Sequence, residues 1–143
     1  MAEIDDVLNA LKQILSQDST LFDIKKWYLV NGMIPSIHPA ASIFPEDEDF
    51  EPYTAAEDKN NPVIKIQLYQ QAAKPEDGEA QVRSLAHKVR YVLGGNPTLN
   101  GVIGYGFVKH IKYLTVDAGE TLLLHAAELT YTPEYLQPRI KGA

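Results

Sequence analysis

The chain has 143 residues, of which 45% are hydrophobic, and its formal net charge is −6. This length suits one globular domain with a substantial core, and the negative charge gives no general attraction for nucleic acid phosphates. The absence of cysteine excludes disulfides and thiolate metal sites and fits a reducing compartment. The acidic start is unlike a signal peptide, and no apolar run reaches the roughly 18 residues of a membrane span. We therefore expect a soluble protein made in the cytoplasm.

Two amphipathic helices are predicted, over residues 3–16 and 79–93. In each, apolar residues recur with the 3.6-residue period of a helix and form one stripe. The first stripe consists of Ile4, Val7, Leu8, Leu11, Ile14 and Leu15, and the second of Val82, Leu85, Ala86, Val89, Val92 and Leu93. Gly94-Gly95 is a typical end for the second helix.

Three strands are predicted in the first half of the chain. Residues 25–30 are followed by a turn at Asn31-Gly32 and by a strand partner over 34–44. Pro35 and Pro39 each remove a ladder donor, so the partner is expected to be an edge or irregular strand. Residues 63–70 alternate cleanly between apolar and polar side chains, which is typical of a strand with one buried face.

The strongest charge pattern lies between Pro45 and Asn61, where seven acids accompany one base. Repulsion between these acids and the scarcity of apolar residues predict a long mobile loop, and loops of this length are usually functional or disordered. Phe50 and Tyr53 are the candidates for anchoring it to a partner. A weak site for divalent cations is the alternative, although the run lacks the alternating pattern of a calcium loop.

Residues 107–116 and 121–131, joined by 117–120, are predicted to form a long β-hairpin. Both faces of these strands carry apolar side chains, so we expect helices to cover one face and a partner subunit to cover the other. The element order predicts an α+β fold with a mainly antiparallel four- to five-stranded sheet and two helices packed on one face. We expect a single domain over 1–143, with 133–143 as an extended C-terminal arm.

The chain offers no recognisable catalytic constellation. His110 and His125 lie on the two arms of the hairpin, but no third ligand has metal-site spacing. The glycines of 101–106 follow a helix and precede a strand, which is the reverse of the dinucleotide-binding arrangement. We expect no catalytic residue, metal or cofactor. Interface residues are the better candidates, and aromatic side chains are enriched among them, although simple core or sheet-surface packing is the commoner role for such side chains. The candidates are Trp27, Tyr28, Phe50, Tyr53, Tyr69, Tyr105 and Tyr113.

Four segments carry a resemblance to a known family: the helix 80–93 (AQVRSLAHKVRYVL), 99–103 (LNGVI), 108–113 (VKHIKY) and 123–131 (LLHAAELTY). Together they resemble the tail terminator, or tail-completion, proteins of tailed bacteriophages, which include the minor tail protein U type. The first helix and the strand at 62–68 follow in the expected order, so the similarity covers most of the chain.

The resemblance implies a structural virion protein without enzymatic activity. Such proteins form hexameric rings that cap the finished tail tube and offer a surface for head joining. The implied partners are the tail-tube protein, a head-side connector or neck protein and, in a contractile tail, the sheath protein. DNA passes through the ring without specific binding, and the protein resides in the tail or neck after assembly in the host cytoplasm.

Two alternatives stay open. One is a head-completion or neck adaptor protein. What the purified protein binds, the tail-tube protein or a portal-side adaptor, distinguishes a terminator from this alternative. The other is a small enzyme or ligand-binding domain that uses the hairpin histidines and the acidic segment.

Overall fold

The structure is a computed structural model that describes residues 2–32, 35–71, 75–117 and 123–140. Its helices are α1 (Ile4–Gln17), the short 3-10 helix η1 (Ser19–Leu21) and α2 (Pro75–Gly94). Its strands are β1 (Lys26–Tyr28), β2 (Ala40–Asp47), β3 (Phe50–Pro52), β4 (Glu57–Asn60), β5 (Val63–Gln71), β6 (Tyr105–Asp117) and β7 (Leu123–Pro138).

All seven strands belong to one sheet, in the order β1-β2-β5-β7-β4-β3, with β6 also paired to β7. Every pair is antiparallel except β1–β2. The predicted α+β class and the long C-terminal hairpin are confirmed. The hairpin strands are longer than predicted, at 13 residues for β6 and 16 for β7.

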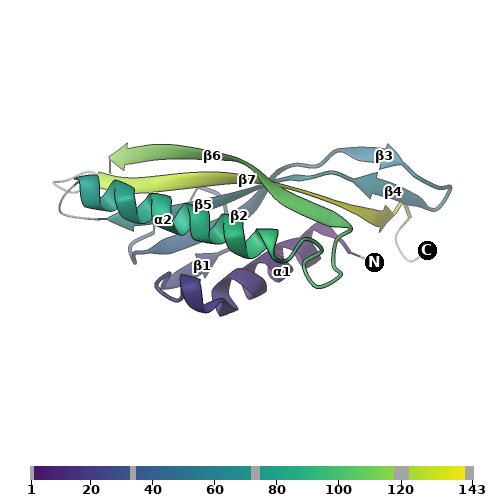
Figure 1. Ribbon diagram of the computed structural model, residues 1–143. Coiled ribbons are helices and arrows are strands. Elements are labelled where there is room, and N and C mark those ends of the chain that lie inside the picture. The colour runs from purple at the N-terminus through teal and green to yellow at the C-terminus, as the bar shows by residue number, and fades with distance from the viewer. Residues whose placement is uncertain (1, 33–34, 72–74, 118–122, 141–143) are drawn as a thin grey trace.

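Both helices pack on the same face of the sheet (Figure 1). α1 starts with a capping box in which the backbone N–H of Glu3 donates to Asp6 Oδ2 at 2.9 Å, an arrangement that satisfies free donors at a helix start. The predicted apolar stripes of both helices belong to one core with the inward side chains of β5, which are Ile64, Ile66 and Leu68. α2 packs on β5 and β7, and α1 on β2. Neither helix is long and apolar enough to cross a membrane, within the described residues.

The strand registers show that β4 and β5 act as one interrupted strand. Asn60 pairs with Tyr135, and Ile64 pairs with Tyr131, so both strands follow β7 in the same register across the break at 61–62. Opposite them, β2 and β3 share one register only after the register shift between Pro45 and Asp47. The sheet therefore extends beyond the helices as a narrow ribbon of β3, β4 and the end of β7 (Figure 1).

This extension overturns the prediction of a loop over 45–61. β2 continues to Asp47, and β3 pairs antiparallel with β4 around a turn at 53–56. The segment, called the acidic arm from here on, has no apolar alternation to reveal its strands. It extends because the pairing of β2 with β5 continues outward, and because the end of β7 supplies a third strand.

Three further boundaries differ from the prediction. β1 pairs with β2 in parallel rather than across the Asn31-Gly32 turn, and β2 is an interior strand because it begins at Ala40, after both prolines. α2 starts at Pro75, four residues before the predicted start. Residues 133–138 are the end of β7, not an extended arm. The turn at 118–120 and residues 141–143 lie outside the described residues.

The second face of the sheet is apolar at one end and polar at the other. Tyr69, Leu124 and Ala126 form a small cluster with Leu114. Further along, Gln67 Nε2 donates to Glu128 Oε2 at 2.7 Å. Lys65 Nζ donates to Thr130 Oγ1 at 2.8 Å and lies 3.4 Å from both Glu46 and Glu128. The two helices thus cover one face of the sheet. The expectation that a partner subunit covers the other face stays a prediction.

Candidate interaction surfaces

The acidic arm is joined to the body by a buried polar cluster around Asn60. This side chain is fully buried, and its Nδ2 lies 3.0 Å from Glu48 Oε1, 3.0 Å from Tyr135 Oη and 3.1 Å from Gln137 Oε1. Burial, with a contribution from the nearby Glu48 carboxylate, raises the pKa of the Tyr135 phenol, which therefore stays neutral. The cluster connects β4 and β7 with Glu48, which lies between β2 and β3, at the base of the arm.

The tip of the arm is held by Arg139, just beyond the end of β7. Its Nε and Nη2 donate to Asp58 Oδ1 at 2.9 and 2.8 Å, and Nη2 also donates to the Thr54 carbonyl at 2.9 Å. The Arg139 backbone N–H donates to the Ala56 carbonyl at 2.9 Å. An arginine that binds both a carboxylate and turn carbonyls fixes the turn more firmly than a single ion pair does.

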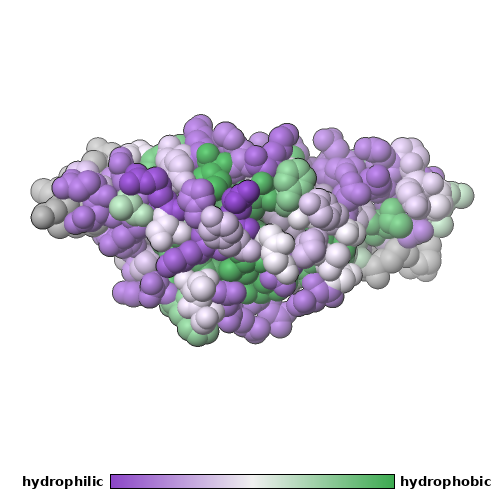
Figure 2. Space-filling view, in the orientation of Figure 1, coloured by the Kyte–Doolittle hydropathy of each residue, from purple (hydrophilic) through white to green (hydrophobic). Residues whose placement is uncertain are grey.

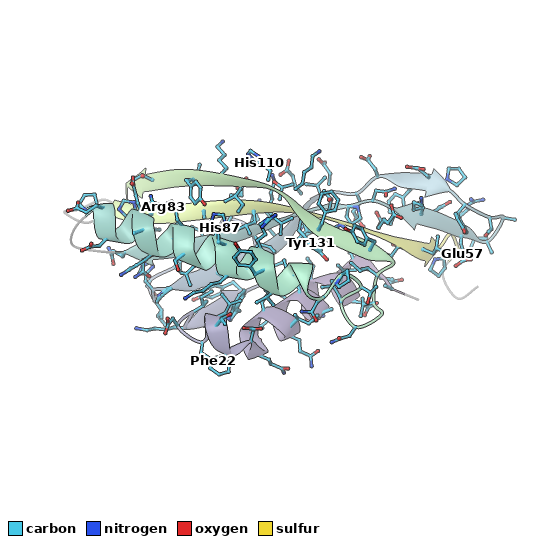
Figure 3. The ribbon with its side chains drawn as sticks, in the orientation of Figure 1. Phe22, Glu57, Arg83, His87, His110 and Tyr131 are labelled. Atoms are coloured by element: carbon cyan, nitrogen blue, oxygen red, sulfur yellow. The ribbon has the colours of Figure 1, made fainter. Side chains whose placement is uncertain are left out.

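The outer surface of the arm is charged and aromatic. All residues from Pro45 to Ala56 are exposed, and the side chains of Phe50 and Tyr53 are 51% and 59% exposed. Glu57, at the base of the tip turn, marks the far end of the molecule (Figure 3). Carboxylates beside exposed rings suit binding to a basic, aromatic protein surface.

An open groove of about 900 Å³ lies between α1 and the arm. Asp6, Asn9 and Gln13 line it from α1, Tyr53 and Lys59 from the arm, and residues 101–104 from the turn before β6. No group of three or more histidine, aspartate or glutamate side chains in the described chain is placed to hold a metal ion.

A second polar surface follows the outer face of α2, and the sequence-based search missed it. Arg83, His87, Arg90 and Tyr91 are all exposed and lie at helical spacing on the side away from the core; they are called the α2 stripe from here on. Arg83 and His87 stand out from this face in Figure 3. Figure 2 shows hydrophilic residues over most of this view, with hydrophobic ones between α2 and α1 and also along β6. The i, i+4, i+7 spacing of these residues could have predicted the α2 stripe from the sequence.

The predicted pair of hairpin histidines does not form a site. His110 pairs with Thr130, whereas His125 pairs with Thr115, and their registers place the two side chains on opposite faces of the sheet. His125 is 2% exposed and packs against α2, where a Cβ on Gly78 would collide with its ring. Glycine at this position lets α2 approach β7 closely.

The glycines of 101–106 have a packing role. Leu99, Asn100 and Gly101 have φ values of +48°, +59° and +87°, the left-handed conformation that a tight turn requires. A Cβ on Gly106 would collide with the Tyr131 ring, which is fully buried beneath it. This accounts for Gly101 and Gly106 without a bound phosphate.

The seven aromatic interface candidates fall into different environments. Tyr69 is 7% exposed and belongs to the second-face cluster, and Trp27 packs against the main core. Tyr28 is half-buried on β1. Tyr105 and Tyr113 on β6 are 55% and 44% exposed, as available for contact as Phe50 and Tyr53. The structure brings Tyr105 to within 6.1 Å of Phe107, measured between ring centroids. An interface role for any of them stays a prediction.

Comparison with known proteins identifies a shared fold but no sequence family. No protein-family profile matches the chain, and no curated protein matches it in sequence. Its fold is similar to that of a chain in a solved structure described as the virion of a native gene transfer agent particle. The TM-score is 0.59 at 14% identity, and the alignment covers 92% of this chain and 95% of that one. The similarity spans nearly the whole of both chains.

Proposed function

We propose that this chain is a structural protein of a phage-like particle, and specifically a tail terminator. The observation that carries the proposal is the fold shared with a virion chain over 92% of the present chain and 95% of the other. Because fold alone does not define function, the terminator role rests additionally on the segments of 80–131 that resemble tail-completion proteins.

The proposed mechanism is occupation of the growing end of the tail tube. Identical subunits form a closed ring through heterologous contacts, and one side of the ring docks on the last tube ring and blocks further addition. The other side receives the head-side connector. The protein acts through surfaces rather than through catalysis, and the exposed acidic arm and the aromatic residues of β6 are its contact regions.

The test is a tube-capping assay with the tail-tube protein of the same particle. Purified protein is added while tubes polymerise, and tube lengths are measured by electron microscopy. Added terminator shortens the tubes in proportion to its concentration and appears as one ring at the tube end. Tubes of unchanged length and uncapped ends would refute the terminator role.

A head-completion or neck adaptor is the runner-up, because the virion similarity does not distinguish positions along the particle. Binding to the portal-side adaptor in the absence of tail-tube protein, with no effect on tube length, would favour it. Binding to tube protein favours the terminator.

A further inference from the structure

Charge is divided between two separate parts of the molecule. Residues 45–61 carry seven acids and one base, whereas residues 80–116 carry five bases and no acid. The first segment forms the acidic arm beyond the helices, and the second forms most of α2 and β6. Figure 3 places Glu57 and Arg83 at opposite ends of the molecule. Within the described residues, no ion pair joins the two parts.

The α2 stripe is the accessible centre of the basic part. Arg83 lies 3.7 Å from Glu79, but both side chains are more than half exposed, and such pairs contribute little to stability. The Arg90 guanidinium lies 5.9 Å from the centroid of the Tyr91 ring, and Tyr91 is 70% exposed. The rings of His87 and Tyr91 are 6.4 Å apart. The stripe thus offers cations and aromatic surface together, without a buried partner.

The acidic arm offers the complementary chemistry. Asp47 and Asp49 are exposed carboxylates with no ion-pair partner among the described residues, and Phe50 and Tyr53 stand exposed beside them. Guanidinium groups bind carboxylates through paired hydrogen bonds and also stack on aromatic rings. The arm and the stripe match in both respects, and their separation within one chain leaves a second copy to bring them together.

We propose that the acidic arm of one copy docks on the α2 stripe of a second copy. The contact uses two different surfaces, so it is heterologous and repeats head to tail until the rotation closes a ring. This inference deepens the terminator proposal, and only the closure into a ring rests on that function. The competing ligand for a basic stripe is nucleic acid, which the net charge of −6 disfavours.

The absence of cysteine allows a direct test by site-specific cross-linking. Ala55→Cys places a thiol at the arm tip, and Ser84→Cys places one beside the α2 stripe; both positions are exposed. The two variants, one carrying a size tag, are mixed and treated with a short bismaleimide. The mixed dimer is expected in high yield. Lys12→Cys, exposed on α1, replaces Ser84→Cys in the matched control and should give at least about tenfold less.

Charge reversal then tests complementarity. Asp47→Lys with Asp49→Lys, and separately Arg83→Glu with Arg90→Glu, should each lower the mixed-dimer yield about tenfold, because like charges across an interface repel. Combining both reversals, one in each cross-linking partner, should restore it. Circular dichroism and unchanged melting temperatures establish that the variants fold.

Three results would overturn the inference: equal yields with the α1 control, yields unaffected by charge reversal, or no rescue by the combined reversal. A short DNA duplex that binds the wild type and not Arg83→Glu with Arg90→Glu, while cross-linking stays unaffected, would instead assign the stripe to nucleic acid. Lost cross-linking with intact tube capping refutes only the interface. Intact cross-linking without capping refutes only the terminator role.

Discussion

The centre of the sheet and the acidic arm are built on the same strands but are stabilised differently. In the centre, β5 and β7 pair over Ile64, Ile66 and Leu129, all fully buried beneath the helices. In the arm, β4 and the same β7 continue in register, but the residues of β3 are all exposed. The continuous register of β7 thus extends the sheet beyond the hydrophobic core. In the arm, polar clusters take the place of apolar side-chain packing.

The largest effect should come from truncating the centre. Leu129→Ala removes a fully buried side chain from the core and should lower the free energy of unfolding by about 2–5 kcal/mol. Urea denaturation followed by circular dichroism measures it. Phe50→Ala, the matched truncation in the arm, should change stability by no more than about 0.5 kcal/mol, since the side chain is exposed. Equal losses would mean that the arm has a core of its own.

An intermediate effect is expected at the boundary, where Asn60 is buried. Asn60→Ala leaves Tyr135 and Gln137 without their shared donor and should cost about 1–3 kcal/mol. Hydrogen exchange should then accelerate in β3 and β4 more than in β5. Asn61→Ala, next in sequence but partly exposed, is the control. Uniform acceleration across the sheet would contradict a cluster that serves the arm alone.

A smaller and local effect is expected at the tip. Arg139→Ala removes both bonds to Asp58 and the bond to the Thr54 carbonyl. Because the pair is partly exposed, the global free energy of unfolding should fall by less than about 1 kcal/mol, whereas amide exchange at residues 54–58 should become clearly faster. Arg139→Lys keeps the charge and should rescue exchange only in part. Unchanged exchange in the alanine variant would show that the turn holds without Arg139.

The smallest effect concerns pH and belongs to the body. Burial lowers the pKa of His38 from its ordinary 6.5, so the unfolded chain binds this proton more readily. His38 thus favours the folded state above pH 6.5, and this advantage is lost as the pH falls through 6.5 toward the lower folded value. His38→Gln should therefore show a slightly shallower decline in stability on acidification. If the stability of wild type and variant fell in parallel with pH, His38 would not contribute to the pH dependence of stability.

The elements that could be predicted from the sequence are those whose own apolar side chains recur with the period of a helix or strand and so mark the buried face. The alternation through Ile64, Ile66 and Leu68 gave β5, and the two helical stripes gave α1 and α2. The arm could not be predicted in this way, because its contacts join residues far apart in the chain, such as Asn60 with Tyr135 and Arg139 with Asp58. Its charge instead suggested a loop.

The candidate surfaces were predicted less well than the fold. Aromatic residue type selected Tyr69, which is buried in the second-face cluster, and Trp27, which packs against the main core. It also selected four exposed residues, Phe50, Tyr53, Tyr105 and Tyr113. Residue type alone does not state which face of a strand lies outward when both faces carry apolar side chains. The α2 stripe could have been predicted from its helical spacing, but only in combination with the absence of acids from residues 80–116.

The length of β7 has a mechanical consequence. Its 16 residues run without interruption from the contact of His125 with α2 to the arm, a span of about 50 Å at the rise of an extended chain. β2 and β3 are separated at 48–49, β5 and β4 are separated at 61–62, and β6 ends opposite Glu134, so among the described strands β7 alone runs without a break from the body into the arm. A load applied at the tip of the arm is transmitted along β7, the strand on which α2 packs.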